Sequence, residues 1–130
     1  MSKINTKVTD SVDFFKGNKP SDLTAKFGSP LYVYSEEILR QRCRDVKNLV
    51  KYPKFSVNYS AKANSNLAFL EIVHEEGLNV DAMSPGEIFV ELKAGFKPEQ
   101  IFYISNNVTA EEMKFAIDHD VLISVDSVSQ

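Results

Sequence analysis

One lysine at the end of an alternating segment is the side chain of this sequence best placed to take part in a reaction. Residues 55–62 alternate as a strand does, so that Asn58, Ser60 and Lys62 share one face, and a polar, turn-forming cluster follows them. A lysine at the carboxyl end of a buried strand can lose hydration, and its neutral amine is then a nucleophile toward carbonyl groups. We therefore predict a chemical role for Lys62, against the commoner alternative of a solvated surface charge.

Acidic and amide side chains stand at the ends of the strand-like segments that follow. Asp81 ends the second segment, and Asn106 and Asp126 follow the third and fourth. In parallel α/β folds these ends meet at one edge of the sheet, where function lies. Neighbouring parallel strands are about 4.8 Å apart, so we expect the amine of Lys62 and the carboxylate of Asp81 to interact directly. Turns and helix N-caps also favour Asn and Asp, and we expect that role for Asn106 and Asp126.

A repeated strand-and-helix unit would position these side chains. Apolar strands begin near Phe55, Leu78, Ile101 and Val121. A helical pattern follows each of the first three strands, and strand–helix–strand units at this spacing predict crossover connections and a parallel sheet.

The helices of this unit carry start and stop signals. The patterns cover residues 66–76, 84–95 and 109–120. Ser84 is a suitable N-cap, with Pro85 at the first helical position and Glu87 three residues after the cap. Thr109 and Glu112 form a second capping box of the same kind. Glu87 therefore has a structural interpretation, as the capping partner of Ser84, besides any role in a site.

The chain before this unit falls into two parts. Residues 1–20 are polar and aperiodic, and we treat them as an N-terminal segment. Residues 21–54 form a leading segment, with a short helix over 21–27, a strand over 31–34 and a longer helix capped by Ser35. Residues 55–130 then hold the repeated unit.

The fold class that this order predicts is α/β, as a partial (β/α)8 TIM barrel. A complete barrel takes about 250 residues, and this chain provides about the first four strands and three connecting helices. The last residues look like the start of another strand-to-helix turn, so we expect a piece of a longer protein, truncated at its C-terminus. A small open α/β sheet would satisfy the same pattern.

Composition limits the classes of partner. The 130 residues are 43% hydrophobic and 25% charged, with a net charge of −3, which argues against nucleic acid and anionic membranes as partners. The single cysteine, Cys43, lies on an apolar helix stripe and cannot form an internal disulfide, which fits a buried thiol in the cytoplasm. No apolar stretch is long enough to span a bilayer, and the N-terminus does not resemble a secretory signal. We expect no metal site.

Several ordered motifs resemble the pyridoxal-phosphate-dependent decarboxylases of the alanine racemase-like fold. The resemblance extends over residues 21–127. The segments that carry it are FGSPLYVYSEEILRQRC at 27–43, YSAKANSN at 59–66, VDAMSPGE at 80–87, SNNVT at 105–109 and VDS at 125–127.

The resemblance implies roles for three residues. Lys62 would be catalytic and would bind pyridoxal 5'-phosphate covalently, as an imine. Asp81 would lie beside the lysine and the cofactor, and Glu87 would belong to the family's Ser-Gly-Gly-Glu element, in which Pro85 here replaces the first glycine. The loop at 105–109 departs from the family's Gly-Asn-Asn-Lys-Thr at two positions, with Ser105 for the glycine and Val108 for the lysine, so the resemblance assigns this loop no direct role.

The diaminopimelate decarboxylases are the branch of that family that the motifs match best. The resemblance then implies conversion of meso-diaminopimelate to L-lysine and carbon dioxide, in lysine biosynthesis, by a cytoplasmic homodimer. The substrate would be a small amino acid, with neither nucleic acid nor membrane as partner. Carboxynorspermidine, ornithine or arginine decarboxylases of the same fold are the alternative, and a non-catalytic α/β module that retains the lysine is another.

Overall fold

A four-stranded parallel sheet forms the centre of the protein in a computed structural model, which describes residues 14–129. Strands β1 (Asn58–Ser60), β2 (Asn79–Ala82), β3 (Ile101–Tyr103) and β4 (Leu122–Ile123) lie side by side in chain order. All three neighbouring pairs are parallel. The parallel sheet that the sequence predicts is therefore confirmed.

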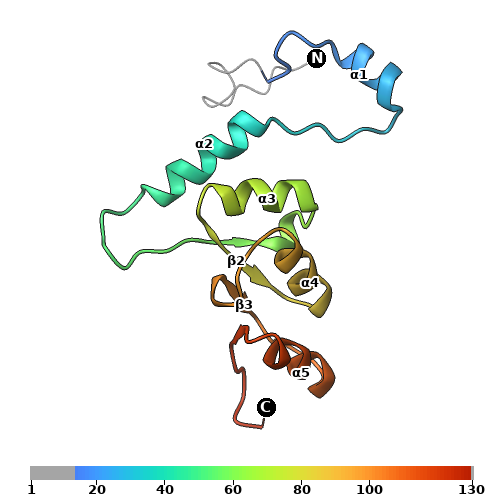
Figure 1. The fold of residues 1–130 in the computed structure, drawn as a ribbon. Helices are drawn as coiled ribbons and strands as arrows, with labels where there is room; N and C mark the ends of the chain where they lie inside the picture. Colours follow the sequence, from blue (N-terminus) through green and yellow to red (C-terminus); the bar gives the residue numbers. More distant parts are fainter. Residues whose placement is uncertain (1–13, 130) are drawn as a thin grey trace.

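Three helices connect these strands and stack in the order of the strands (Figure 1). They are α3 (Leu67–Glu75), α4 (Pro85–Lys93) and α5 (Ala110–Asp118). Their N-caps are confirmed for Ser84 and Thr109, whose hydroxyls accept hydrogen bonds from the backbone N–H groups of Glu87 and Glu112. The short 3-10 helix η2 (Pro98–Gln100) leads into β3.

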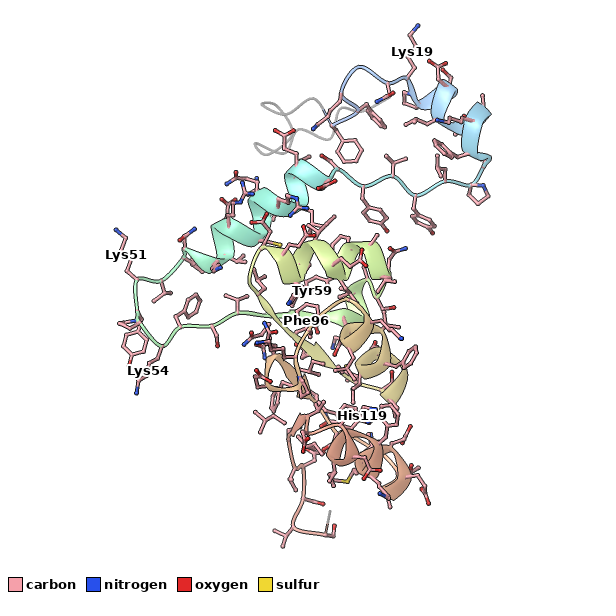
Figure 2. The ribbon with its side chains drawn as sticks, in the orientation of Figure 1. Lys19, Lys51, Lys54, Tyr59, Phe96 and His119 are labelled. Atoms are coloured by element: carbon pink, nitrogen blue, oxygen red, sulfur yellow. The ribbon has the colours of Figure 1, made fainter. Side chains whose placement is uncertain are left out.

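The core lies between the helices and one face of the sheet. On the strands, the fully buried side chains are those of Val80, Ala82, Ile101 and Tyr103. The helices contribute Leu70, Val73, Ile88 and Ala116, which are also fully buried. Tyr59 of β1 completes this layer at the edge, where its ring packs on Phe69 of α3 with 5.5 Å between the ring centroids (Figure 2).

The opposite face of the sheet is more polar. Alternation places Asn58, Ser60, Asn79 and Asp81 there, and these side chains are exposed or half-buried. The side chains of candidate chemical interest are therefore on the face that the helices leave uncovered.

The leading segment contains α1 (Pro20–Phe27) and α2 (Glu36–Lys47), and α2 packs on α3. Arg44 makes two hydrogen bonds to the carboxylate of Glu76, at 2.8 and 2.9 Å, and Arg40 contacts Glu75 and Glu76 at 2.7 and 3.1 Å. The hydrogen bonds from these arginines, Arg44 first, lower the pKa of Glu76. Cys43 is the buried residue of α2, as the sequence predicts.

One element of the leading segment is a wrong prediction. Residues 31–34 are not a strand: they belong to no sheet in the described part of the chain, and their side chains are exposed. A strand needs a neighbouring strand for its backbone hydrogen bonds, and an apolar alternation alone supplies none. The first twenty residues, which we set apart, lie mostly outside the described residues.

We predict that Leu70 carries a large share of the packing of α3. Replacing this fully buried leucine by alanine should lower the free energy of unfolding by about 2–5 kcal/mol, because the cavity cannot close completely. The measurement is urea denaturation followed by circular dichroism. Leu67→Ala on the same helix, where the leucine is 43% exposed, is the matched control and should cost much less. Equal losses would contradict the assigned packing.

Candidate functional site

A hydrogen bond joins the carboxyl ends of β1 and β2. Ser60 lies directly opposite Asp81 in the parallel register, and its Oγ donates to Oδ1 of Asp81 at 2.7 Å. Both side chains are half-buried on the uncovered face of the sheet. The edge predicted to hold the site therefore carries a carboxylate that a neighbouring strand holds in place.

Lys62 lies in the turn beyond this bond. β1 ends at Ser60, and Ala61–Ala63 form the 3-10 helix η1, which packs against β2. Ala61 is fully buried and anchors the turn, whereas the side chain of Lys62 is exposed. Lys62 forms no hydrogen bond or ion pair with any residue from 14 to 129. Its amine is thus uncommitted at the edge where the carboxylate stands.

The expected direct interaction between Lys62 and Asp81 is therefore not made in this structure. The strand was expected to run to Lys62, but it stops two residues earlier, at Ser60. The register consequently places a hydroxyl, and not the amine, opposite Asp81. The turn still brings Lys62 to the same edge of the sheet as Asp81.

Glu87 holds the turn that follows β2. Its Oε2 accepts a hydrogen bond from the backbone N–H of Met83 at 2.6 Å, and its own N–H donates to Ser84 Oγ at 3.2 Å. The expected capping box is shifted by one residue, because the carboxylate reaches past Ser84 to Met83. Glu87 thus fixes the backbone just after Asp81 and is half-buried there. A direct contact of Glu87 with a cofactor stays a prediction.

The ends of β3 and β4 carry structural polar groups. The backbone N–H of Ser105 donates to Ser124 Oγ at 3.2 Å, and Ser105 Oγ donates to the carbonyl oxygen of Ser124. Asn106 is exposed, and Thr109 begins α5 with both bonds of its capping box. The turn role expected for Asn106 agrees with this placement. Asp126, which follows β4, is exposed.

Glu91 is a buried acid that the sequence analysis missed. Its side chain is fully buried on the face of α4 that packs on the sheet, one turn after Ile88. Neither carboxyl oxygen has a hydrogen-bond partner among the residues that the structure describes. Burial, followed by the nearby charges of Glu87 and Asp81, raises the pKa of Glu91 to about 8. A glutamate three residues after Ile88, on an apolar stripe, was the signal available in the sequence.

Residues 14–129 contain neither a metal-binding cluster nor a helix that could span a membrane. No group of three or more His, Cys, Asp or Glu side chains within residues 14–129 is placed to hold a metal ion. None of the helices described there is both long and apolar enough to cross a bilayer.

Comparison with known families identifies the domain to which this edge belongs. Residues 36–130, more than half of the chain, match the family model of the pyridoxal-dependent decarboxylases, pyridoxal binding domain. The chain belongs to this family. The matched region contains Lys62, Asp81 and Glu87, so the predicted site residues all lie within the pyridoxal-binding domain.

Curated relatives are longer than this chain. A diaminopimelate decarboxylase of Methanothermobacter thermautotrophicus is 46% identical over 111 residues, which are 84% of this chain and 26% of that protein. A diaminopimelate decarboxylase of Bacillus subtilis is 37% identical over 101 residues, which are 76% of this chain and 23% of that protein. The chain therefore spans about a quarter of the length of these relatives.

Solved structures share the fold. Diaminopimelate decarboxylase from Helicobacter pylori, complexed with L-lysine, superposes with a TM-score of 0.78 at 31% identity, over 84% of this chain and 28% of that one. Lysine/ornithine decarboxylase from Vibrio vulnificus gives 0.76 at 19% identity, over 84% of this chain and 30% of that one, and shows the fold alone. The predicted fold class, the opening part of a (β/α)8 barrel, is confirmed.

The residues at this edge fit a pyridoxal group. Such a group carries an aldehyde, and the uncommitted amine of Lys62 is the chemical partner that an aldehyde needs. The carboxylate of Asp81 is at the same edge, held by Ser60, where it can face a cationic part of the cofactor or of a substrate. The chemistry of these donors agrees with the family.

The buried Glu91 should make the free energy of unfolding depend on pH. Between about pH 4.5 and 8 the folded protein retains the Glu91 proton and the unfolded chain releases it, so stability falls as the pH rises and the loss is complete above the raised pKa. Glu91→Gln removes this titration. We expect it to gain stability over the native protein between pH 5 and pH 8.5, on the order of a few kcal/mol.

The measurement for Glu91 is the urea midpoint across that pH range. Glu71→Gln, which alters an exposed glutamate on α3, is the control and should leave the slope unchanged. A native slope that persists in Glu91→Gln would show that Glu91 is not the buried acid that titrates.

Proposed function

We propose that this chain is the cofactor-binding part of a pyridoxal-phosphate-dependent amino-acid carboxy-lyase, with Lys62 as the residue that binds the cofactor covalently. The observation that carries the proposal is the uncommitted amine of Lys62 at the carboxyl edge of the sheet, inside the region that matches the pyridoxal-binding domain. In this proposal residues 55–130 hold the cofactor, and residues 21–54 lead into that part after a polar segment at 1–20.

In this proposal each residue at the edge has a separate role. Lys62 supplies the amine, and η1 keeps it at the end of β1 through the buried side chain of Ala61. Asp81 supplies a negative charge at the same edge of the sheet, and Glu87 fixes the turn from β2 into α4. The cofactor, when bound, supplies the electron sink that accepts the electron pair left by the departing carbon dioxide.

For the full-length protein, we propose conversion of meso-diaminopimelate to L-lysine and carbon dioxide. The support is the similarity to relatives named diaminopimelate decarboxylase, at up to 46% identity among those described above. Ornithine, arginine or carboxynorspermidine as substrate has weaker support, because the likeness to the lysine/ornithine enzyme is at 19% identity. The motif resemblance also supports a cytoplasmic homodimer that takes a small amino acid, without nucleic acid or membrane as partner.

Covalent capture tests the role of Lys62. After incubation with pyridoxal phosphate and reduction with borohydride, we expect the pyridoxyl group mainly on Lys62, located by peptide mass spectrometry. Lys62→Ala should lose this label. Lys54→Ala is the matched control, because Lys54 lies exposed in the loop that leads into β1, away from α3 to α5 (Figure 2). Equal labelling of Lys62→Ala and the native chain would support the non-catalytic module instead.

Release of carbon dioxide tests the activity. Because the 130 residues span about a quarter of their relatives, we expect no measurable release from meso-diaminopimelate by this chain alone. A full-length protein that contains the chain should prefer meso-diaminopimelate over ornithine, arginine and carboxynorspermidine, and its Lys62→Ala variant should be inactive. Turnover by the isolated chain, or a preference for another of these substrates, would contradict the assignment.

A further inference from the structure

Ser60 makes the only side-chain hydrogen bond to Asp81 that the structure records within residues 14–129. The two residues are register partners on adjacent strands, so the backbone ladder fixes the distance between their Cα atoms. The short bond of 2.7 Å, between two half-buried groups, then fixes the direction of the carboxylate. Ser60 is also the N-cap residue of η1, but its side chain makes no capping hydrogen bond there, so the hydroxyl serves Asp81 and not the start of that helix.

We propose that Ser60 is a positioning residue: its hydroxyl holds the carboxylate of Asp81 on the sheet and keeps it from pairing with the amine of Lys62. This inference rests on the proposed function, in which Lys62 must attack an aldehyde. An ion pair with Asp81 would favour the ammonium form of Lys62, which has no lone pair for that attack. The observed arrangement, with the carboxylate on Ser60 and the amine uncommitted, avoids this competition.

The charged groups near Asp81 include one amine and two other acids. The elements packed against β2 carry other titratable side chains. Lys62 comes from η1, and Glu87 and Glu91 come from α4. Tyr59 of β1 and Tyr103 of β3 lie on the opposite face of the sheet, under the helices. The tyrosines are neutral near pH 7, and burial raises the pKa of both. Glu91 is protonated there, and Glu87 is another acid. A carboxylate released from Ser60 would therefore turn toward Lys62, the cation in this set.

The test compares the pH profile of capture in two variants. In the capture reaction the lone pair of the Lys62 nitrogen adds to the aldehyde carbon, the oxygen leaves as water with both amine protons, and borohydride with a proton from water reduces the C=N bond to a secondary amine. Ser60→Ala should move the midpoint of this profile upward by about one pH unit, because the freed carboxylate stabilises the ammonium form. Ser60→Thr keeps the hydroxyl and should restore the native midpoint.

Two controls isolate the hydroxyl. Ser56→Ala removes a serine that precedes β1 and makes no hydrogen bond within the described range, so it should leave the profile unchanged. Asp81→Asn removes the charge, and adding Ser60→Ala to it should then produce no further shift. A Ser60→Ala shift that persists without the Asp81 charge would overturn the proposal.

A second readout needs no cofactor. The side-chain resonances of Lys62 in the native chain and in Ser60→Ala can be titrated by NMR, and the same upward shift of the midpoint is expected. An unchanged midpoint overturns the positioning role, whether or not pyridoxal phosphate labels Lys62. Failure of the native chain to label at Lys62, with the NMR shift present, overturns the proposed function and leaves the positioning role standing.

Discussion

The parallel register of β1 against β2 is the constraint on which the rest of the candidate site depends. It sets Ser60 opposite Asp81 and so decides which group the carboxylate meets. A slip of one residue would exchange the two faces of a strand, burying the polar side chains and exposing Tyr59 or Val80. The apolar face therefore fixes the register, and the register in turn fixes the chemistry on the other face.

The packing of α4, unlike the pairing of β1 with β2, leaves a polar group without a partner among residues 14–129. Its stripe buries Ile88 in the core, but one turn later it also buries Glu91, whose oxygens have no partner in the described residues. An ionised carboxylate would be costly there, which is why the group keeps its proton well above the usual range. α3, α5 and the strands beneath already surround α4, so this acid is an internal feature of the helix layer.

Local signals made the helices predictable from the sequence. The strands were predicted less accurately, because a strand depends on pairing with residues that are distant in the chain. The caps at Ser35, Ser84 and Thr109 form within one turn of chain, so their residues are sufficient to specify them. The alternation at 31–34 looked like a strand but has no neighbour to bond with. The alternation at 55–62 continues past the true end of β1. There the chain turns at Ala61–Ala63, and this turn packs on β2, which the local pattern of residues does not reveal.

The sequence by itself determined the order of strands and helices, the parallel sheet, and the presence of Lys62 and Asp81 at one edge of the sheet with Glu87 at a helix start. These features follow from apolar periodicity and from capping residues, which act over a few neighbours. Only the tertiary structure decided that Asp81 bonds to Ser60, that Lys62 stays uncommitted and that Glu91 is buried. These contacts depend on the register of the strands and on which helices pack on each face of the sheet. Both are set by residues that are distant from one another in the chain.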